Sequence, residues 1–137
     1  MADNMTPEQR SRTMSRIRSR NTASEVALRK ALHRRGLRFR IHVRSLPGTP
    51  DIVFPGVRLV VFVDGDFWHG RHYAAKHTEW KNYWRAKIAR NMERDRTADG
   101  ALAIAGWRVL RIWERDLRNT IEVWSERIEQ IVRVPAE

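Results

Sequence analysis

Apolar and polar residues alternate without a break in "LRFRIHV", residues 37–43. This period of two predicts a strand that buries one face. The polar face would carry Arg38, Arg40 and His42. "DIVF", residues 51–54, predicts a second short strand, and "VRLVVFV", residues 57–63, is apolar enough to lie in the middle of a sheet. Because only the turn segments "SLPGTP" and "PG" separate them, the three strands should form a meander.

A helix is predicted before these strands. "TASEVALRKALHRRG" opens with a capping box from Thr22 to Glu25, continues with apolar residues at helical spacing, and stops at Gly36.

The second half of the chain changes period twice. Residues 78–105 have helical spacing, with a break expected near Gly100. "WRVLRIW", residues 107–113, predicts another strand, and a last helix should start at Thr120. The order helix, three strands, helix, strand, helix predicts an α/β fold with a mixed central sheet flanked by helices. With 137 residues and no linker, the chain is expected to form a single domain over 1–137.

Charge indicates the partner. Lys plus Arg total 27 against 16 Asp plus Glu, a net charge of +11, which favours a polyanion and above all nucleic acid. An anionic membrane fits less well, because the basic segments lack a strongly amphipathic anchor. Residues 1–21 are expected to form a basic arm on the phosphate backbone, the alternative being a disordered solubilising tail. Its arginines include Arg12, Arg16, Arg18 and Arg20.

The chain contains no cysteine, so neither disulfides nor thiolate zinc sites are expected. The start "MADNMTPEQR" lacks the apolar segment of a secretory signal. We therefore expect a cytoplasmic protein.

Carboxylates occur where two predicted strands end. Asp51 begins one strand, and Val63 and Asp64 end its neighbour, so hairpin pairing should bring them together as one acidic site. Carboxylates with a backbone carbonyl suit Mg²⁺ when the substrate supplies phosphate oxygens. The Pro50-Asp51 pair with a later acid is a loose form of the restriction-endonuclease-like PD-(D/E)XK signature.

The lysine of that signature is missing from "DGDFWHG". His69 is a candidate to replace it as the base that takes a proton from water, and Asp95 is a candidate to orient the His69 ring. The alternative is a His69 that packs against the neighbouring aromatics.

The segments "LPGTPD", "VFVDGDFWHG", "YWRAKIARNMERD", "GWRVLRIWE" and "RNTASE" resemble the very short patch repair (Vsr) endonucleases, in the same order over nearly the whole chain. The resemblance implies a restriction-endonuclease-like fold and a monomeric, magnesium-dependent hydrolase of mismatch repair. It would nick one strand of duplex DNA 5′ to the thymine of a T:G mismatch produced by deamination.

The same resemblance implies roles for residues of this chain. Asp51 would bind the metal beside the Val63 carbonyl, and Glu25 would act through water. Asp64 matches a position that holds Asp or His in the family. These acids would work with the His69 and Asp95 pair described above.

Phe67, Trp68 and Trp84 match the aromatics that enter the duplex beside the mismatch in the family. Mismatched base steps open more cheaply than paired ones, so such wedges can detect a mispair. The alternative of core packing is strongest for Trp84, which has helical spacing with Trp80 and Ile88.

One departure from the family concerns its structural zinc, since Asp66, Arg71 and Arg115 occupy ligand positions here. Asp66, His72 and His77 could form only a weak site, and arginines argue against zinc. We expect salt bridges from Asp66 to Arg71 or Arg115 to hold this loop instead.

Two alternatives to T:G nicking remain open. A nuclease of the same fold would act on uracil or another deaminated base, or in homing or defence. A DNA-binding module without catalysis would keep only the arginines. Under the resemblance, the protein would be bacterial, bound to the nucleoid, and associated with mismatch-repair proteins.

Overall fold

The computed structural model describes residues 21–66, 70–71 and 82–134. Its sheet has four strands in the order β1-β2-β3-β4. Strands β1, β2 and β3 pair antiparallel and β4 is parallel to β3, so the sheet is mixed as predicted. These strands span Arg40–Ile41, Ile52–Phe54, Leu59–Asp64 and Arg108–Trp113.

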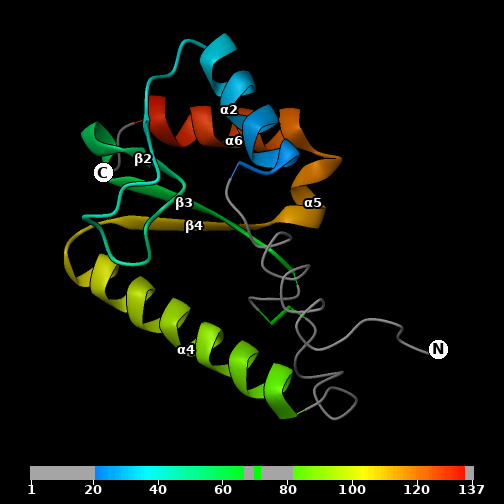
Figure 1. Ribbon diagram of the computed structural model, residues 1–137. Coiled ribbons are helices and arrows are strands. Elements are labelled where there is room, and N and C mark those ends of the chain that lie inside the picture. Colours follow the sequence, from blue (N-terminus) through cyan, green and yellow to red (C-terminus); the bar gives the residue numbers. More distant parts are fainter. Residues whose placement is uncertain (1–20, 67–69, 72–81, 135–137) are drawn as a thin grey trace.

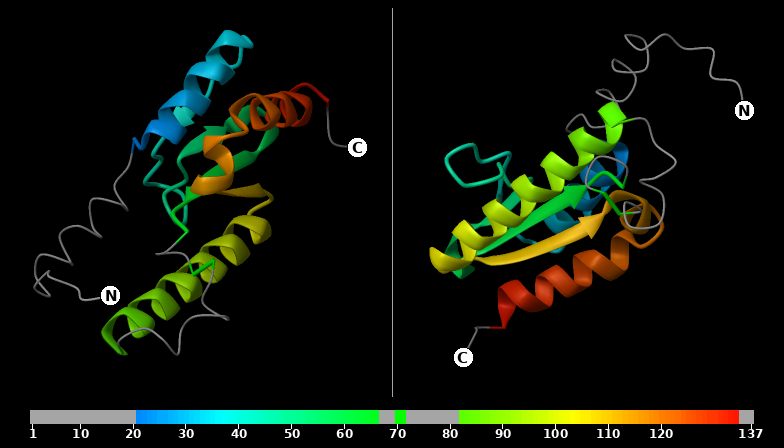
Figure 2. Two further views of the ribbon diagram at one scale, coloured as in Figure 1. Left: turned by 90° about the vertical axis from the view of Figure 1, so that its right-hand side faces the viewer. Right: turned by 90° about the horizontal axis from the view of Figure 1, so that it is seen from below.

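Helices cover both faces of the sheet, as Figure 1 shows. Helices α2 and α6 lie together on one face, and the long helix α4 lies along the other, an arrangement that Figure 2 shows from two further directions. The helices are α2 (Ala23–Arg34), α4 (Asn82–Ile104), the short α5 (Glu114–Arg118) and α6 (Ile121–Arg133). A 3₁₀ turn, η1 (Pro55–Val57), joins β2 to β3.

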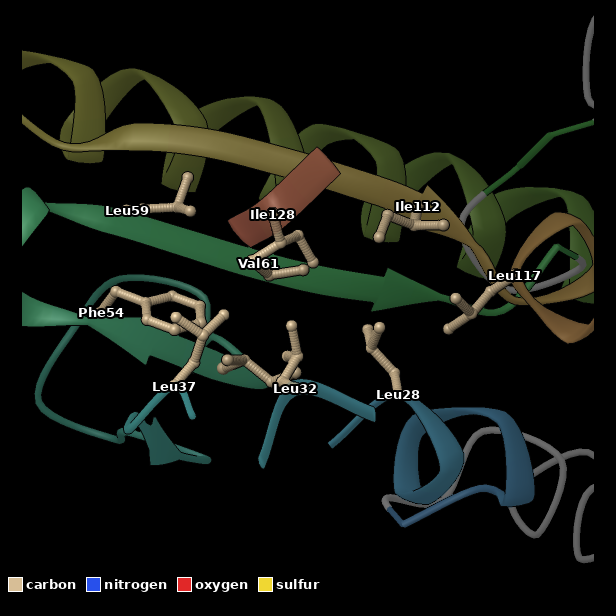
Figure 3. Close-up of a cluster of buried hydrophobic side chains, with 10 residues drawn as sticks. Leu28, Leu32, Leu37, Phe54, Leu59, Val61, Ile112, Leu117 and Ile128 are labelled. Carbon is tan, nitrogen blue, oxygen red and sulfur yellow. The ribbon is translucent and has the colours of Figure 1, made fainter. Parts of the chain in front are cut away.

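Alternation along β2 and β3 divides the core into two clusters. The cluster under α2 and α6 contains Ile52, Leu59 and Val61, together with Leu28 and Leu32 of α2 (Figure 3). The cluster under α4 contains the intervening residues Val53, Val60 and Phe62, with Leu102 of the helix. Both faces of β3 are buried, which explains its nearly continuous apolar sequence.

The predicted strand over 37–43 is wrong in length, because β1 contains only Arg40 and Ile41. The alternation does begin as expected, with Leu37 buried, but Ile41 is 44% exposed. His42 then adopts a left-handed backbone with φ of 48°, which stops the strand.

Helix α4 continues through Gly100 to Ile104, so the expected break near Gly100 is wrong. Nothing lies within 4 Å of the position that a Cβ would take at Gly100, which therefore sits on an open surface. A single glycine there costs only about 1 kcal/mol, less than the packing of the rest of the helix provides. Helix α5, between β4 and α6, was not predicted, since it has only five residues.

Within the described residues, no helix has the length and apolar character needed to cross a bilayer.

Candidate active site

Asp51 directly precedes β2 and is held against the C-terminal end of β3. Its backbone N–H donates to the carbonyl oxygen of Val61 at 3.0 Å, and its Oδ2 accepts a hydrogen bond of 2.7 Å from the N–H of Val63. The expected proximity of Asp51 to the end of β3 is confirmed. Their roles in metal binding stay predictions.

The turn before Asp51 needs its glycine. Gly48 has φ of 77°, and a Cβ there would lie 3.0 Å from the Ala98 side chain and 3.1 Å from the Phe62 ring. A larger residue would be strained by both the backbone and the packing. The "LPGTPD" turn is thereby held against α4 and β3, and Asp51 is held with it.

Glu25 reaches the same region from the first turn of α2. Its backbone N–H donates to Oγ1 of Thr22 at 3.3 Å, which confirms half of the predicted capping box. The side chain is buried and contacts two nitrogen-bearing side chains: its Oε2 lies 2.9 Å from Nε2 of His42 and accepts a hydrogen bond from Nη1 of Arg29. The Glu25 side chain therefore contacts His42 and Arg29 in the site, and the second bond of a capping box, from the N–H of Thr22 to this side chain, is not among its contacts with the described residues.

His42 is the residue that the sequence did not mark as functional. Its backbone N–H donates to the carbonyl oxygen of Asp51 at 3.1 Å, and its ring points to Glu25. Among the described residues, the Glu25, His42 and Asp51 side chains offer ligand atoms that all lie within 4.8 Å of one another. In the sequence, His42 was marked only by its position on the polar face of a predicted strand. Arg38 and Arg40 occupy the same face, so this position did not single out His42.

The carboxylate of Asp64, at the end of β3, binds Arg111 of β4. Both of its carboxylate oxygens accept hydrogen bonds of 2.9 Å from Nη1 of Arg111. Residues two apart in a strand face the same side of the sheet. Asp64 therefore lies with Phe62 on the side of α4. The expected single acidic site of Asp51 and Asp64 stays a prediction, as does the proposed part of Asp64 in catalysis.

Arg111 gathers a second acidic cluster on that side. Its Nε and Nη2 donate to Asp99 at 3.0 and 2.7 Å, and its Nη1 lies 3.8 Å from Oδ1 of Asp95. Burial lowers the pKa of Arg111, but hydrogen bonds to Asp99 and the charge of Asp64 outweigh it, so the net pKa is raised. The guanidinium also stacks over the Phe62 ring, 4.0 Å from its centroid.

A hollow with a volume of about 240 Å³ opens beside this cluster. It is lined by Asp64, Met92, Asp95, Arg96, Asp99, Arg111 and Trp113. Asp95 therefore lies at an accessible place on α4, as an orienting acid requires. Its predicted partner His69 lies outside the described residues.

Several further predictions also fall outside the described residues: those for Phe67, Trp68 and the arm arginines Arg12, Arg16, Arg18 and Arg20. Trp84 is described and is only 7% exposed, with its ring edge-on to Tyr83 at 4.8 Å between centroids. This burial favours the core-packing alternative for Trp84, whose role as a wedge stays a prediction.

Ion pairs join Asp66 and Arg71, which follow β3, to helix α5. Nη1 of Arg71 pairs with Oδ2 of Asp66 and with Oδ1 of Asp116, both at 2.9 Å, and hydrogen bonds to Asp116 and Asp66 raise the pKa of Arg71. The expected Asp66–Arg71 salt bridge is confirmed. Arg115 contributes its backbone N–H, which donates to Oδ1 of Asp66 at 3.2 Å, rather than its side chain.

The mixed sheet, with helices on both faces and an acidic strand end beside a glutamate of the first helix, defines a nuclease of the restriction-endonuclease-like class. The family model described as "DNA mismatch endonuclease Vsr" matches residues 2–75. The chain belongs to this Vsr family of DNA endonucleases and is a hydrolase that acts on DNA.

Curated relatives agree with the family match over most of the chain. The type II nicking enzyme V.XorIIP of Xanthomonas oryzae pv. oryzae is 47% identical over 121 residues, which cover 87% of this chain and 89% of that protein. The type II nicking enzyme V.NmeDIP of Neisseria meningitidis serogroup C is 41% identical over 96% of this chain and 90% of its own length. The DNA mismatch endonuclease Vsr of Escherichia coli K12 is 42% identical over 95% of this chain and 87% of its own.

Proposed function

We propose that this endonuclease requires Mg²⁺ and nicks one strand of duplex DNA 5′ to the mispaired thymine of a T:G mismatch. The observation that carries the proposal is the pairing of Asp51 with the N–H of Val63, which holds a carboxylate at a strand end beside the buried Glu25. The relative from E. coli is named a mismatch endonuclease, which supports the same substrate here.

The oxygen ligands fit a hard divalent cation. Asp51 and the Val63 carbonyl would hold Mg²⁺, and Glu25 would bind water next to it. When bound, Mg²⁺ supplies a Lewis acid that stabilises the negative charge on the phosphoryl oxygens.

The chain's own residues would then move the proton. His69 takes a proton from the attacking water, whose oxygen forms a bond to phosphorus while the bond to the leaving sugar oxygen breaks. Asp95 holds the His69 ring in position. Support for this pairing comes from Gly70, where a Cβ would collide with Met92 of α4. Gly70 is the next residue after His69 in the sequence, and Asp95 lies one helical turn beyond Met92 on α4, which supports the proposed pairing.

The test uses end-labelled duplexes that carry one T:G pair, one U:G pair or no mismatch, incubated with the purified protein and Mg²⁺. We expect a single nick 5′ to the thymine of the T:G duplex and little cleavage of the matched duplex. Preferential cleavage of U:G would assign the site to another deaminated base. Cleavage independent of any mismatch would contradict the proposed substrate.

We further propose that the enzyme acts as a monomer in the bacterial cytoplasm on nucleoid DNA, where mismatch-repair proteins would process the nick. Sedimentation of the protein with a stoichiometric T:G duplex should give the mass of one chain per duplex. A complex of two chains would contradict the monomer.

A further inference from the structure

His42 brings an imidazole into the same small space as the two carboxylates of the proposed metal site. Glu25 comes from α2, His42 follows β1, and Asp51 precedes β2. We infer that His42 is a direct ligand of the catalytic cation, through Nε2, and that this site therefore prefers Mn²⁺ to Mg²⁺. The inference rests on the proposed metal-dependent nuclease function and adds a nitrogen ligand to it.

The distances suit one cation bound by all three side chains, with Glu25 binding it directly in place of the water-mediated contact proposed above. In an octahedral site with ligands at about 2.1 Å, neighbouring ligand atoms lie about 3.0 Å apart and opposite ones about 4.2 Å apart. Nε2 of His42 and Oε2 of Glu25 are 2.9 Å apart, which is the separation of neighbours. The whole set lies within 4.8 Å, so only a small inward movement separates it from the coordinated geometry.

The surroundings already orient these ligands. The Glu25 side chain is 4% exposed and that of His42 14%, so both are largely removed from bulk water. Arg29 donates to the same Oε2 of Glu25 that faces His42. A carboxylate oxygen has two lone-pair directions, so Arg29 can keep one while the other turns to a cation, as partners of metal ligands commonly do.

The backbone at His42 directs the ring to this place. Its left-handed φ of 48° ends β1 and turns the chain immediately beside Asp51. The hydrogen bond from the backbone N–H of His42 to the carbonyl oxygen of Asp51 keeps the two residues next to each other. The His42 imidazole is therefore positioned by a backbone segment that is hydrogen-bonded to Asp51.

A nitrogen ligand changes which cation is bound best. Mg²⁺ favours oxygen ligands and keeps most of its water, whereas imidazole suits more polarisable transition-metal ions. Mn²⁺ accepts the same octahedral geometry and carboxylate ligands, so it can use His42 without distorting the site. We expect wild-type protein to bind Mn²⁺ about tenfold more tightly than Mg²⁺, because Mn²⁺ gains more than Mg²⁺ from an imidazole ligand.

The test is pulsed electron paramagnetic resonance of Mn²⁺ bound to the full chain, with and without a T:G duplex. Wild type should show hyperfine coupling to an imidazole nitrogen. His42→Asn should lose the coupling and most of the Mn²⁺ preference, and asparagine is chosen because it tolerates the left-handed backbone. His33→Gln is the matched control: its ring stacks on Phe39 at 4.5 Å, away from the site, so the coupling should remain.

Persistence of the nitrogen coupling in His42→Asn, or its absence from Mn²⁺-loaded wild type, would overturn the inference. Failure of the proposed function gives a different result, namely no Mg²⁺-dependent nicking of the T:G duplex by a wild-type protein that retains the coupling. If circular dichroism shows that His42→Asn does not fold, the inference is tested on the wild-type protein alone. Substoichiometric Mn²⁺ should broaden the magnetic resonance signal of the His42 ring and leave that of His33 sharp, and equal sharpness would refute the coordination.

Discussion

The backbone N–H of Val63 donates a hydrogen bond of 2.7 Å to Oδ2 of Asp51. This bond occupies one side of the carboxylate with a fixed donor and sets its orientation relative to β3. A carboxylate oxygen of Asp51 also lies within 4.8 Å of ligand atoms of Glu25 and His42. The strand pairing that builds the sheet thus also positions the proposed metal ligand, which allows its charge to be tested separately from its place in the fold.

Asp51→Asn should remove Mg²⁺-dependent nicking while preserving the fold. An amide oxygen can still accept from Val63, but the negative charge that attracts the cation is gone, and the rate should fall by at least about 10²-fold. Nicking is measured with the T:G duplex, beside a melting curve. DNA binding should survive or tighten, because one negative charge near phosphate has been removed.

Two results would contradict the metal assignment of Asp51. One is full activity of the Asp51→Asn enzyme. The other is full activity of the wild type in EDTA.

His69 and Asp95 should behave as one unit in kinetics. His69→Ala should remove most of the rate, and Asp95→Asn somewhat less. Adding Asp95→Asn to His69→Ala should change little, since an orienting carboxylate has no role without its imidazole. Single-turnover nicking rates of the four proteins measure the coupling. Losses that multiply in the double variant would show that the two residues act independently.

Much of the fold was predictable because the spacing of apolar residues indicated helices and strands, and turn residues indicated where they end. The apolar run ending at Val63 had to be a central strand, and the spacing of Ile121 and Ile128 had to be a helix. Errors arose where a local signal competed with tertiary packing. Gly100 indicated a break, yet α4 stays continuous, and Ala98 and Leu102 on either side of the glycine are buried.

The site was predictable in part. Pairing of β2 with β3 brought Asp51 to Val63, as antiparallel geometry requires. Strand alternation places the Asp64 side chain on the side of α4, where it binds Arg111, a partner that the sequence did not indicate. His42 could not be identified from the sequence, because its approach to Glu25 depends on where β1 stops.

Arg111 should be important for stability. Its guanidinium is the shared partner of Asp64 and Asp99, so Arg111→Met would remove the cation that these carboxylates share. Removing one member of a largely buried ion pair typically costs about 3–5 kcal/mol. Urea unfolding measures this loss as a change in the free energy of unfolding.

Arg96→Met is the matched control for Arg111→Met. Arg96 pairs with Glu93 on the surface of α4, where their side chains are 65% and 68% exposed. Exposed pairs contribute less than about 1 kcal/mol, so the variant should unfold almost as the wild type does. Equal losses of unfolding free energy in both variants would show that the Arg111 ion pairs contribute no more to stability than an exposed pair.

The loop after β3 should depend on ionic pairing rather than on zinc. Arg71→Met removes the cation between Asp66 and Asp116 and should lower the melting temperature, and the difference from wild type should shrink as salt screens the pairs. Chelators should leave the melting temperature of the wild type unchanged. Stoichiometric zinc in elemental analysis, or a melting temperature that falls on chelation, would reveal a substitute metal site.

Phe67 and Trp68 should govern the choice of substrate rather than the chemistry. If their rings enter the base stack, the cost of opening is lowest at a mispair. Phe67→Ala and Trp68→Ala should therefore reduce the ratio of binding to T:G over matched duplex, with nonspecific binding still strong at low salt and weak at high salt. Fluorescence anisotropy with both duplexes measures the ratio. An unchanged ratio would place these aromatics in the packing of the site.

Trp84 provides the comparison that separates packing from recognition. Because Trp84 is 7% exposed whereas its neighbour Tyr83 is 57% exposed, Trp84→Ala should cost about 3–5 kcal/mol of stability and Tyr83→Ala much less. Trp84→Phe keeps most of the buried volume and so isolates any contribution to mismatch binding. If Trp84→Phe is stable and lowers the T:G preference, the ring acts as a wedge. If it keeps the preference of the wild type while Trp84→Ala melts early, Trp84 belongs to the core.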